Sequence, residues 1–411
     1  MINKIHQMDC LEGMKKIPDN SIDSCVTDPP YGLSKEPDIR EVLKKWLNNE
    51  PYDHKHAGFM GKTWDSFVPH PDIWREVYRV LKPGAHALVF AGTRTQDLMT
   101  ISLRLAGFEV RDVIEWLYFS GFPKSMDVSK AIDKKLGAER KLIGLKYNKG
   151  RAKANVYAGQ WNIESEFDKV TAPATELAKK WEGWGTALKP AHEPIIMVRK
   201  PLDGTVADNV EKWGTGAINI DGCRVPTNDS IGKRPPSTER EHGFFLNTNE
   251  YTPSDKGRFP ANCVTVEDDQ FYSTYFNITP PELSKKASKK DRNSDWCGEE
   301  IDLPERVKVG ERDGRNAFPK NSAGEKGKHS PRMRNTHPTV KPTDLMAWLI
   351  RLVTPPNGVV LDPFAGSGST LVAAKREGFN FIGFELEKEY VEIAEARISG
   401  EPEQQALFYL G

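Results

Sequence analysis

The chain has 411 residues, of which 38% are hydrophobic, and its 58 basic and 58 acidic residues give a formal net charge of zero. This length is enough for two domains or for one domain with a large insertion. A balanced charge does not single out a nucleic-acid-binding protein, and it does not exclude one, because a local basic face is what contacts phosphate. No apolar run reaches the length of a membrane span, and the N-terminus lacks a signal-peptide pattern. We therefore expect a cytoplasmic protein without membrane contacts.

The five cysteines are scattered and form no CxxC pair, which favours reduced thiols over a metal site. One alternative is a zinc site built from Cys223, Cys263, Cys297 and a histidine such as His242. His54 and His56 lack acidic or cysteine partners at ligand spacing, so we expect no metal there.

Residues 1–126 alternate between short strands and helices and form the first part of the predicted core. Strands are predicted over 2–6, 21–27, 85–91 and 109–119, and helices over 11–17, 73–81 and 97–106. The segment 33–66 is expected to form a loop beside the reaction pocket, with Trp46 and Trp64 as packing residues. This rhythm indicates a mostly parallel sheet with helices on its faces, the doubly wound α/β class.

The middle of the chain changes character. Residues 127–183 contain basic clusters and two helical stretches, so we expect a helical insertion. Residues 184–202 carry one core strand, at 195–198. Residues 203–335 are turn-rich and are broken up by charge clusters. The Lys and Arg clusters in 127–183 and 285–334 are candidate phosphate contacts, although any one of them could equally be a solvated face.

The alternating rhythm returns in 336–411, the last part of the predicted core. Strands are predicted over 359–361 and 379–385, and helices over 344–352, 369–376 and 388–398.

A glycine loop joins the strand at 359–361 to the next helix. Asp362-Pro363-Phe364-Ala365-Gly366-Ser367-Gly368 turns sharply, and a helix opens at Ser369-Thr370. Glycines let the backbone approach a ligand closely, and a helix N-terminus supplies N–H donors. Glu385 ends the following strand, where its carboxylate can accept hydrogen bonds from both hydroxyls of a ribose. The loop therefore predicts a nucleoside-containing cofactor.

Two cofactors compete for this loop. A dinucleotide loop of the GxGxxG type needs a third glycine where this chain has Leu371. The carboxylate of Asp362 would repel a pyrophosphate, whereas it could hold the cationic amino group of S-adenosylmethionine. The residues favour S-adenosylmethionine over NAD, and an ordinary strand–turn–helix corner without a ligand is the remaining alternative.

Asp28-Pro29-Pro30-Tyr31 follows the predicted strand at 21–27, at the end where open α/β sheets bind ligands. Two prolines force a rigid, extended turn, and Pro29 keeps a carbonyl acceptor. Asp28 and the Pro29 carbonyl can therefore both accept from one –NH₂ group, which makes its lone pair more available, while Tyr31 can stack on the ring. An ordinary loop turn can have the same four residues, so this motif indicates a reaction site only together with the glycine loop. The strands at 22–27 and 359–361 can be neighbours if the fold is circularly permuted.

With both motifs in this order, the chain resembles the β group of DNA amino-methyltransferases, which modify exocyclic nitrogens of DNA bases. Residues 8–12, 18–23 and 28–32 look like the N-terminal signature of that group, and 337–342 look like its motif for the methionine end of the cofactor. The resemblance covers about half of the chain, roughly 1–126, 184–202 and 336–411. It implies a Rossmann-like methyltransferase sheet with 203–335 as the target-recognition region. This chain departs from the compact members in the length of its middle region.

The resemblance also implies a role for each site residue. Asp28, Pro29, Pro30 and Tyr31 would be catalytic. Asp9 and Cys10 would lie at the cofactor's adenine, and Glu385 would hold the ribose. The methionine and loop side would be lined by His337, Lys341, Asp362, Phe364, Gly366, Gly368 and Thr370. No metal would take part, and Cys25 is interpreted as a core residue because the chemistry needs no cysteine nucleophile.

The implied function is site-specific transfer of a methyl group from S-adenosylmethionine to N6 of an adenine flipped out of double-stranded DNA. Asp at the first motif position is more typical of adenine N6 enzymes, and Ser of cytosine N4 enzymes. Cytosine N4 therefore stays the alternative base. Also open are an RNA or protein amide methyltransferase, a non-catalytic nucleic-acid-binding module and an NAD oxidoreductase. The sequence does not decide whether a restriction endonuclease partner exists or whether the protein is a homodimer.

Overall fold

The computed structural model describes residues 1–56, 65–118, 125–147, 167–225, 257–264, 335, 337 and 339–401. These residues form two compact units. The larger unit holds 1–118, 191–225, 257–264 and the described residues from 335 onward, and the smaller unit holds 125–147 and 167–190. The predictions for Trp64, His242, Cys297 and the basic clusters of 285–334 lie outside the described residues.

The larger unit is built on an eight-stranded sheet with the order β1-β10-β9-β2-β3-β7-β4-β8. Its strands are β1 (Lys4–Gln7), β2 (Ile22–Thr27), β3 (Leu81–Phe90), β4 (Glu109–Leu117), β7 (His192–Arg199), β8 (Cys263–Val264), β9 (Val359–Asp362) and β10 (Asn380–Glu385). Strand pairings are parallel except at β7, which runs antiparallel to both β3 and β4. The mostly parallel α/β sheet confirms the predicted fold class.

Helices cover both faces of this sheet. They are α1 (Cys10–Met14), α2 (Ile39–Leu47), α3 (Pro71–Val80), α4 (Gln96–Leu105), α8 (Val206–Trp213), α12 (Thr343–Val353), α13 (Ser369–Arg376) and α14 (Lys388–Gly400), with a short 3₁₀ turn at Asp221–Cys223. The apolar residues of α12, α13 and α14 share one buried cluster, and those of α1 to α4 share another. Neighbouring residues of β2 divide between the clusters, Val26 in the first and Cys25 in the second, as the two faces of a strand require.

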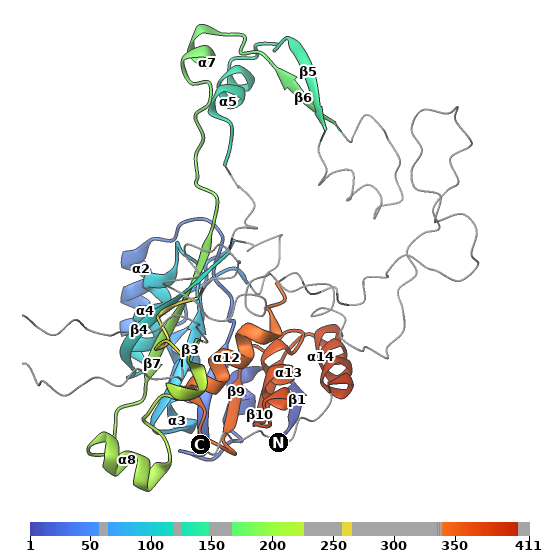
Figure 1. Cartoon of the computed structure of the whole chain (residues 1–411). Coiled ribbons are helices and arrows are strands. Elements are labelled where there is room, and N and C mark those ends of the chain that lie inside the picture. The colour runs from blue at the N-terminus through green and yellow to red at the C-terminus, as the bar shows by residue number, and fades with distance from the viewer. Residues whose placement is uncertain are drawn as a thin grey trace, which may run out of the picture. The chain divides into compact units, whose positions relative to one another are not determined.

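The two ends of the chain meet in the middle of the sheet. β2 pairs with β9, with Ser24 opposite Val360 and Cys25 opposite Leu361, and Figure 1 shows the orange strands β9 and β10 beside the blue β1. From β2 the chain continues to β3 on one side, and from β9 it continues to β10 on the other. The change of direction in strand order therefore lies between β2 and β9, where a doubly wound sheet binds ligands. The predicted adjacency of these strands is confirmed.

The structure differs from the sequence prediction at 33–66, which contains helix α2 as well as loop. Asp38 caps this helix by accepting hydrogen bonds from the backbone N–H groups of Arg40 and Glu41, at 2.9 and 3.4 Å. Val42 and Trp46 lie one turn apart and are both buried. The packing role predicted for Trp46 is confirmed.

The smaller unit contains α5 (Val128–Lys135), α7 (Glu176–Lys180) and a two-stranded antiparallel hairpin of β5 (Leu142–Tyr147) and β6 (Phe167–Thr171). The two helices agree with the expected helical stretches, but the hairpin was not expected. Buried Asp133 of α5 accepts hydrogen bonds from Arg140, from Ala174 and from the backbone and hydroxyl of Thr175. This carboxylate joins α5 to the segment that leads into α7.

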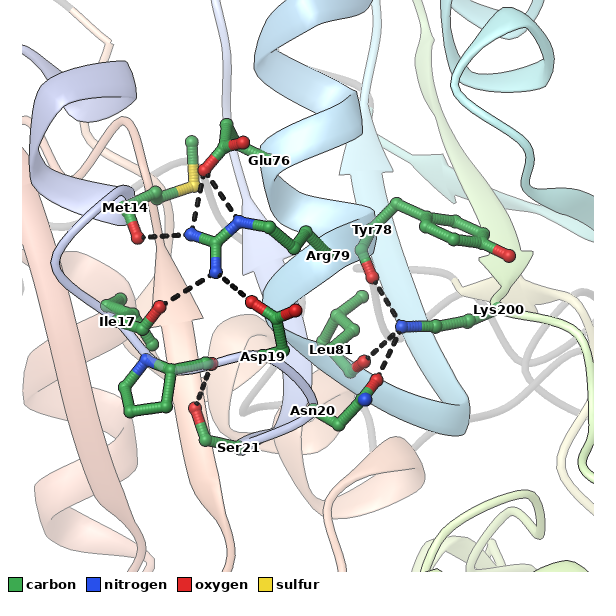
Figure 2. Close-up of polar contacts among 11 residues, drawn as sticks. Met14, Ile17, Asp19, Asn20, Ser21, Glu76, Tyr78, Arg79, Leu81 and Lys200 are labelled. Atoms are coloured by element: carbon green, nitrogen blue, oxygen red, sulfur yellow. Dashed lines mark hydrogen bonds and ion pairs between the residues drawn. The ribbon is translucent and has the colours of Figure 1, made fainter.

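At the edge of the sheet where β2 begins, two cations hold the segment that enters it (Figure 2). Arg79, in the last turn of α3, donates to the carbonyls of Met14 and Ile17 at 2.7 and 2.9 Å. Lys200 donates to three oxygens, those of the Asn20 side chain and of the Tyr78 and Leu81 carbonyls. These donors satisfy carbonyls near the ends of α1 and α3 that have no partner within their helices. They fix the start of β2, and so the place where β2 ends.

Candidate active site

Two loops that are far apart in sequence lie side by side at the carboxyl edge of the sheet. Asp28 follows the last residue of β2, and Asp362 is the last residue of β9. The Thr27 hydroxyl donates to Oδ1 of Asp362 at 2.6 Å, so the two strand ends are joined by a side-chain hydrogen bond. The structure thus brings the two predicted motifs together.

The turn after Asp28 is held by two residues that the sequence did not single out. Oδ1 of the buried Asp65 accepts from the backbone N–H groups of Tyr31 and Gly32, at 2.8 and 3.1 Å. The Thr95 hydroxyl donates to the Tyr31 carbonyl at 2.6 Å. A carboxylate that accepts two backbone N–H bonds fixes the turn, and so fixes where Tyr31 can lie.

A part-buried polar cluster surrounds Asp28. Nζ of Lys341 lies 2.6 Å from Oδ2 of Asp28 and 3.3 Å from Oε2 of Glu193. The Tyr31 hydroxyl donates to the same Glu193 oxygen at 2.9 Å. Oδ1 of Asp28 is buried and has no hydrogen-bond partner among the described residues. Asp28 therefore offers one acceptor atom that Lys341 does not occupy.

The charges in this cluster depend on one another. Burial raises the pKa of Asp28, Lys341 opposes that rise, and the carboxylate of Glu193 adds to it. Burial alone would lower the pKa of Lys341, but Asp28 and Glu193 raise it above its ordinary value, so this side chain stays an ammonium at neutral pH. Burial also raises the pKa of the Tyr31 hydroxyl, which stays a donor. With both carboxylates ionised, the cluster has one positive and two negative charges.

The glycine loop after β9 is tight because its neighbours lie close. Gly366 and Gly368 have φ of +51° and +80°, in the left-handed region that favours glycine. A Cβ on Gly366 would lie 2.9 Å from Nε2 of His337, and a Cβ on Gly368 would lie 2.8 Å from the Cβ of Ala394 in α14. These contacts place His337 beside the loop and leave no room for larger residues at either glycine.

Buried Arg397 holds this loop from α14. Its Nη1 donates to the carbonyl and the hydroxyl of Ser367, and to the hydroxyl of Ser369. An arginine late in the last helix carries no local sign of this role, so the sequence did not reveal it.

Asp362 and Glu385 end neighbouring strands and are both engaged with backbone N–H groups. Oδ1 of Asp362 accepts from Phe364 at 3.1 Å in addition to Thr27, and burial raises the pKa of this carboxyl to about 6. Oε2 of Glu385 accepts from Gly366 at 2.9 Å, which joins the end of β10 to the glycine loop. Burial raises the pKa of Glu385 as well. Each carboxylate therefore lies at the loop where the sequence predicts it.

The other predicted residues lie at the same edge or in its core. Oδ1 of Asp9 caps α1 by accepting from the backbone N–H groups of Leu11 and Glu12. Cys10 is buried, and burial raises the pKa of its thiol to about 12. Phe364 lies beside Trp74, with ring centroids 6.1 Å apart, and Thr370 is buried in the first turn of α13.

Four adjacent strands thus end at a predicted site residue, namely Asp9 after β1, Glu385 on β10, Asp362 on β9 and Asp28 after β2. Cys25 faces the core within β2, and burial raises the pKa of its thiol well above the ordinary value. Such a thiol is not a nucleophile at neutral pH.

Within the described ranges, no three His, Cys, Asp or Glu side chains are grouped so that they could hold a metal ion. In the same part of the chain, no helix is both long enough and apolar enough to span a bilayer.

Known proteins resemble this chain at the level of family, sequence and structure. The family model of N6/N4-type DNA methylases matches residues 22–396. The Type II methyltransferase M.HindIII of Haemophilus influenzae is 25% identical over 97% of this chain and 96% of its own length. The Type II methyltransferase M.BglII of Bacillus subtilis is 43% identical over 19% of this chain and 21% of its own length.

Two solved structures of methyltransferases are similar over nearly the whole chain. The M1.HpyAVI–SAM complex is 16% identical, with a TM-score of 0.38, over 96% of this chain and 98% of its own. The cytosine-N4-specific PvuII DNA methyltransferase is 14% identical, with a TM-score of 0.42, over 96% of this chain and 85% of its own.

Proposed function

The chain belongs to the N6/N4 family of DNA methylases, and on that premise we propose that it transfers a methyl group from S-adenosylmethionine to N6 of an adenine flipped out of duplex DNA. One observation carries the proposal. The part-buried carboxylate of Asp28, whose buried Oδ1 has no hydrogen-bond partner among the described residues, follows β2 directly beside the glycine loop that follows β9. An acceptor for an amino group and a loop for a nucleoside cofactor therefore share one edge of the sheet.

Asp28 and Pro29 would hold the base by its amino group. Oδ1 of Asp28 and the Pro29 carbonyl would accept the two N–H bonds of that group, and Tyr31 would lie against the ring. Two acceptors draw electron density toward the nitrogen and fix the direction of its lone pair. Positioning of this kind supplies much of the acceleration in transfer reactions that need no covalent enzyme intermediate.

The residues around the glycine loop fit S-adenosylmethionine. The left-handed glycines at 366 and 368 let the loop backbone turn sharply and lie close to His337 and α14, and Glu385 ends the strand at which a ribose would lie. Asp362 would attract the cationic amino group of the cofactor. When bound, the cofactor supplies an electrophilic methyl carbon, and the residues of this chain would hold the amino nitrogen in line with it.

The choice of adenine rests on Asp28, because aspartate at this position is typical of adenine N6 enzymes. Cytosine N4 is the alternative, since its amino group would make the same two hydrogen bonds. The test is sequencing of DNA from cells that express the wild-type chain or Asp28→Ala, with a readout that separates N6-methyladenine from N4-methylcytosine. We expect N6-methyladenine at one recognised sequence with the wild type only. N4-methylcytosine would correct the base, and unmodified DNA from cells with folded wild-type protein would refute the proposal.

A further inference from the structure

We propose that Glu193 is a positioning residue of the reaction pocket, which gives the cluster around Asp28 its excess negative charge and holds Tyr31 and Lys341 in place. This inference rests on the proposed function of the Asp28 site. Glu193 lies outside both sequence motifs, in the strand between the two halves of the core.

Glu193 reaches the pocket because β7 is antiparallel to its neighbours β3 and β4. The second residue of β7 lies opposite Trp116, near the carboxyl end of β4, whereas the last residue of β7 lies opposite Glu109 at the start of β4. The first residues of β7 therefore lie at the same edge of the sheet as Asp28. A parallel strand in this position would bring its last residues there instead.

The Glu193 carboxylate joins three elements. Oε2 accepts from the Tyr31 hydroxyl at 2.9 Å and lies 3.3 Å from Nζ of Lys341. The carboxylate also interacts with the Tyr118 hydroxyl at the end of β4. The ammonium of Lys341 lies over the rings of Tyr31 and Phe90, 5.2 and 5.0 Å from their centroids. Among the described residues, loss of Glu193 would leave this ammonium with Asp28 as its one carboxylate partner.

The charge matters because methyl transfer moves a positive charge. The amino nitrogen forms a bond to the methyl carbon as the carbon–sulfur bond breaks, and the electrons of that bond go to sulfur, which becomes a neutral thioether. The positive charge then lies on the amino nitrogen, which gives a proton to Asp28 and through it to water. A neutral pair of Asp28 and Lys341 would do little for this arriving charge, whereas a cluster with a net charge of −1 stabilises it in a site shielded from water.

A purely structural role makes a different prediction. If Glu193 only held the Tyr31 hydroxyl, glutamine could do so equally well, because its carbonyl oxygen is an acceptor of similar shape. Glu193→Gln keeps this hydrogen bond and removes the charge. Glu193→Asp keeps the charge on a shorter side chain. Glu115→Gln is the matched control, since Glu115 lies opposite Pro194 on the neighbouring strand.

The experiment measures single-turnover transfer of labelled methyl groups from S-adenosylmethionine to unmethylated DNA, as a function of pH. We expect Glu193→Gln to slow transfer about 100-fold, the usual effect of losing one preorganised electrostatic group. The KM for DNA and the affinity for S-adenosylmethionine should change less than about threefold. Glu193→Asp should be at least about tenfold faster than Glu193→Gln, and Glu115→Gln should match the wild type.

The pH profile gives a second readout. The charged and titratable groups that face Asp28 and Glu193 are Tyr31, Tyr118, Lys341 and Asp362. Glu193 raises the pKa of Asp28, so its neutralisation should move the acid limb of the rate profile to lower pH. A structural defect would lower the rate at every pH without this shift.

The outcomes separate this inference from the proposed function. A wild type that transfers no methyl group to DNA overturns both. An active wild type with a Glu193→Gln rate within about threefold overturns this inference alone. Equal losses in folded Glu193→Gln and Glu193→Asp, with an unmoved acid limb, also overturn it, because they would show that side-chain size matters and charge does not.

Discussion

Gly368→Ala tests how tightly the glycine loop is held against α14. The new Cβ would lie 2.8 Å from the Cβ of Ala394, a separation that the loop or the helix must relieve by moving. The left-handed φ of +80° costs an alanine about 1 kcal/mol, and crowding in a well-packed region costs about 1–3 kcal/mol more. We therefore expect the free energy of unfolding to fall by about 3 kcal/mol. Gly214→Ala is the control, because Gly214 has φ of +71° and no described atom within 4 Å of a Cβ built there, so only the cost of about 1 kcal/mol applies.

Urea unfolding followed by tryptophan fluorescence measures both variants, since Trp46 and Trp74 are buried in the same unit as the two glycines. Binding of S-adenosylmethionine to Gly368→Ala should weaken in the same preparation, and binding to Gly214→Ala should not. The reasoning would be refuted if Gly368→Ala lost no more stability than Gly214→Ala.

Three further predictions concern the same loop. Arg397→Met should lower the free energy of unfolding by about 2 kcal/mol, because it leaves the buried Ser367 carbonyl without this donor. Arg351→Met is the control and should lower the free energy of unfolding by less than about 1 kcal/mol, since its ion pair with Glu377 is partly exposed. Equal losses of the two variants in urea unfolding would contradict the role of Arg397 in holding the loop. Calorimetry should show the Kd for S-adenosylmethionine rising about tenfold from pH 7 to pH 5, because the cation binds the ionised form of Asp362 and the pKa of this carboxyl in the free protein is about 6. Asp362→Asn should remove most of this pH dependence of the Kd. A variant whose Kd still rose about tenfold between pH 7 and pH 5 would show that Asp362 is not the group responsible. Because the folded pKa of Asp362 lies above the unfolded value, the same group should make the free energy of unfolding fall as pH rises from about 4 to about 6, and a contribution of opposite sign would argue against its burial.

The sequence predicted the residues whose role follows from the chain immediately around them. Asp28 directly follows a predicted strand, Asp362 directly follows another, and each precedes a proline, so local order was enough to place them at the carboxyl edge of a parallel sheet. The prediction that their two strands are neighbours followed from assigning both residues to one site, because a circularly permuted sheet places those strands side by side.

The residues that were missed act across long stretches of chain. Glu193 belongs to the site because β7 is antiparallel, and an apolar strand between two prolines carries no sign of its direction. Asp65 and Arg397 hold backbone that lies many residues away, and nothing near them in sequence indicates which backbone that is. Helix α2 is a different case, because Asp38 and Glu41 form a visible start signal that the loop prediction for 33–66 overlooks.

The pairing of β2 with β9 has a consequence during synthesis of the protein. About 330 residues separate these neighbouring strands, and a ribosome that adds about 5–20 residues per second needs roughly 15–70 s to make them. Through that interval β2 has β3 on one side and an unpaired edge on the other. An unpaired strand edge is a template for wrong pairing, so the nascent chain should depend on chaperones until β9 emerges. Because residues 28–31 are made early and the glycine loop is made late, a prematurely terminated chain would carry Asp28 without the loop that lies beside it in the folded protein.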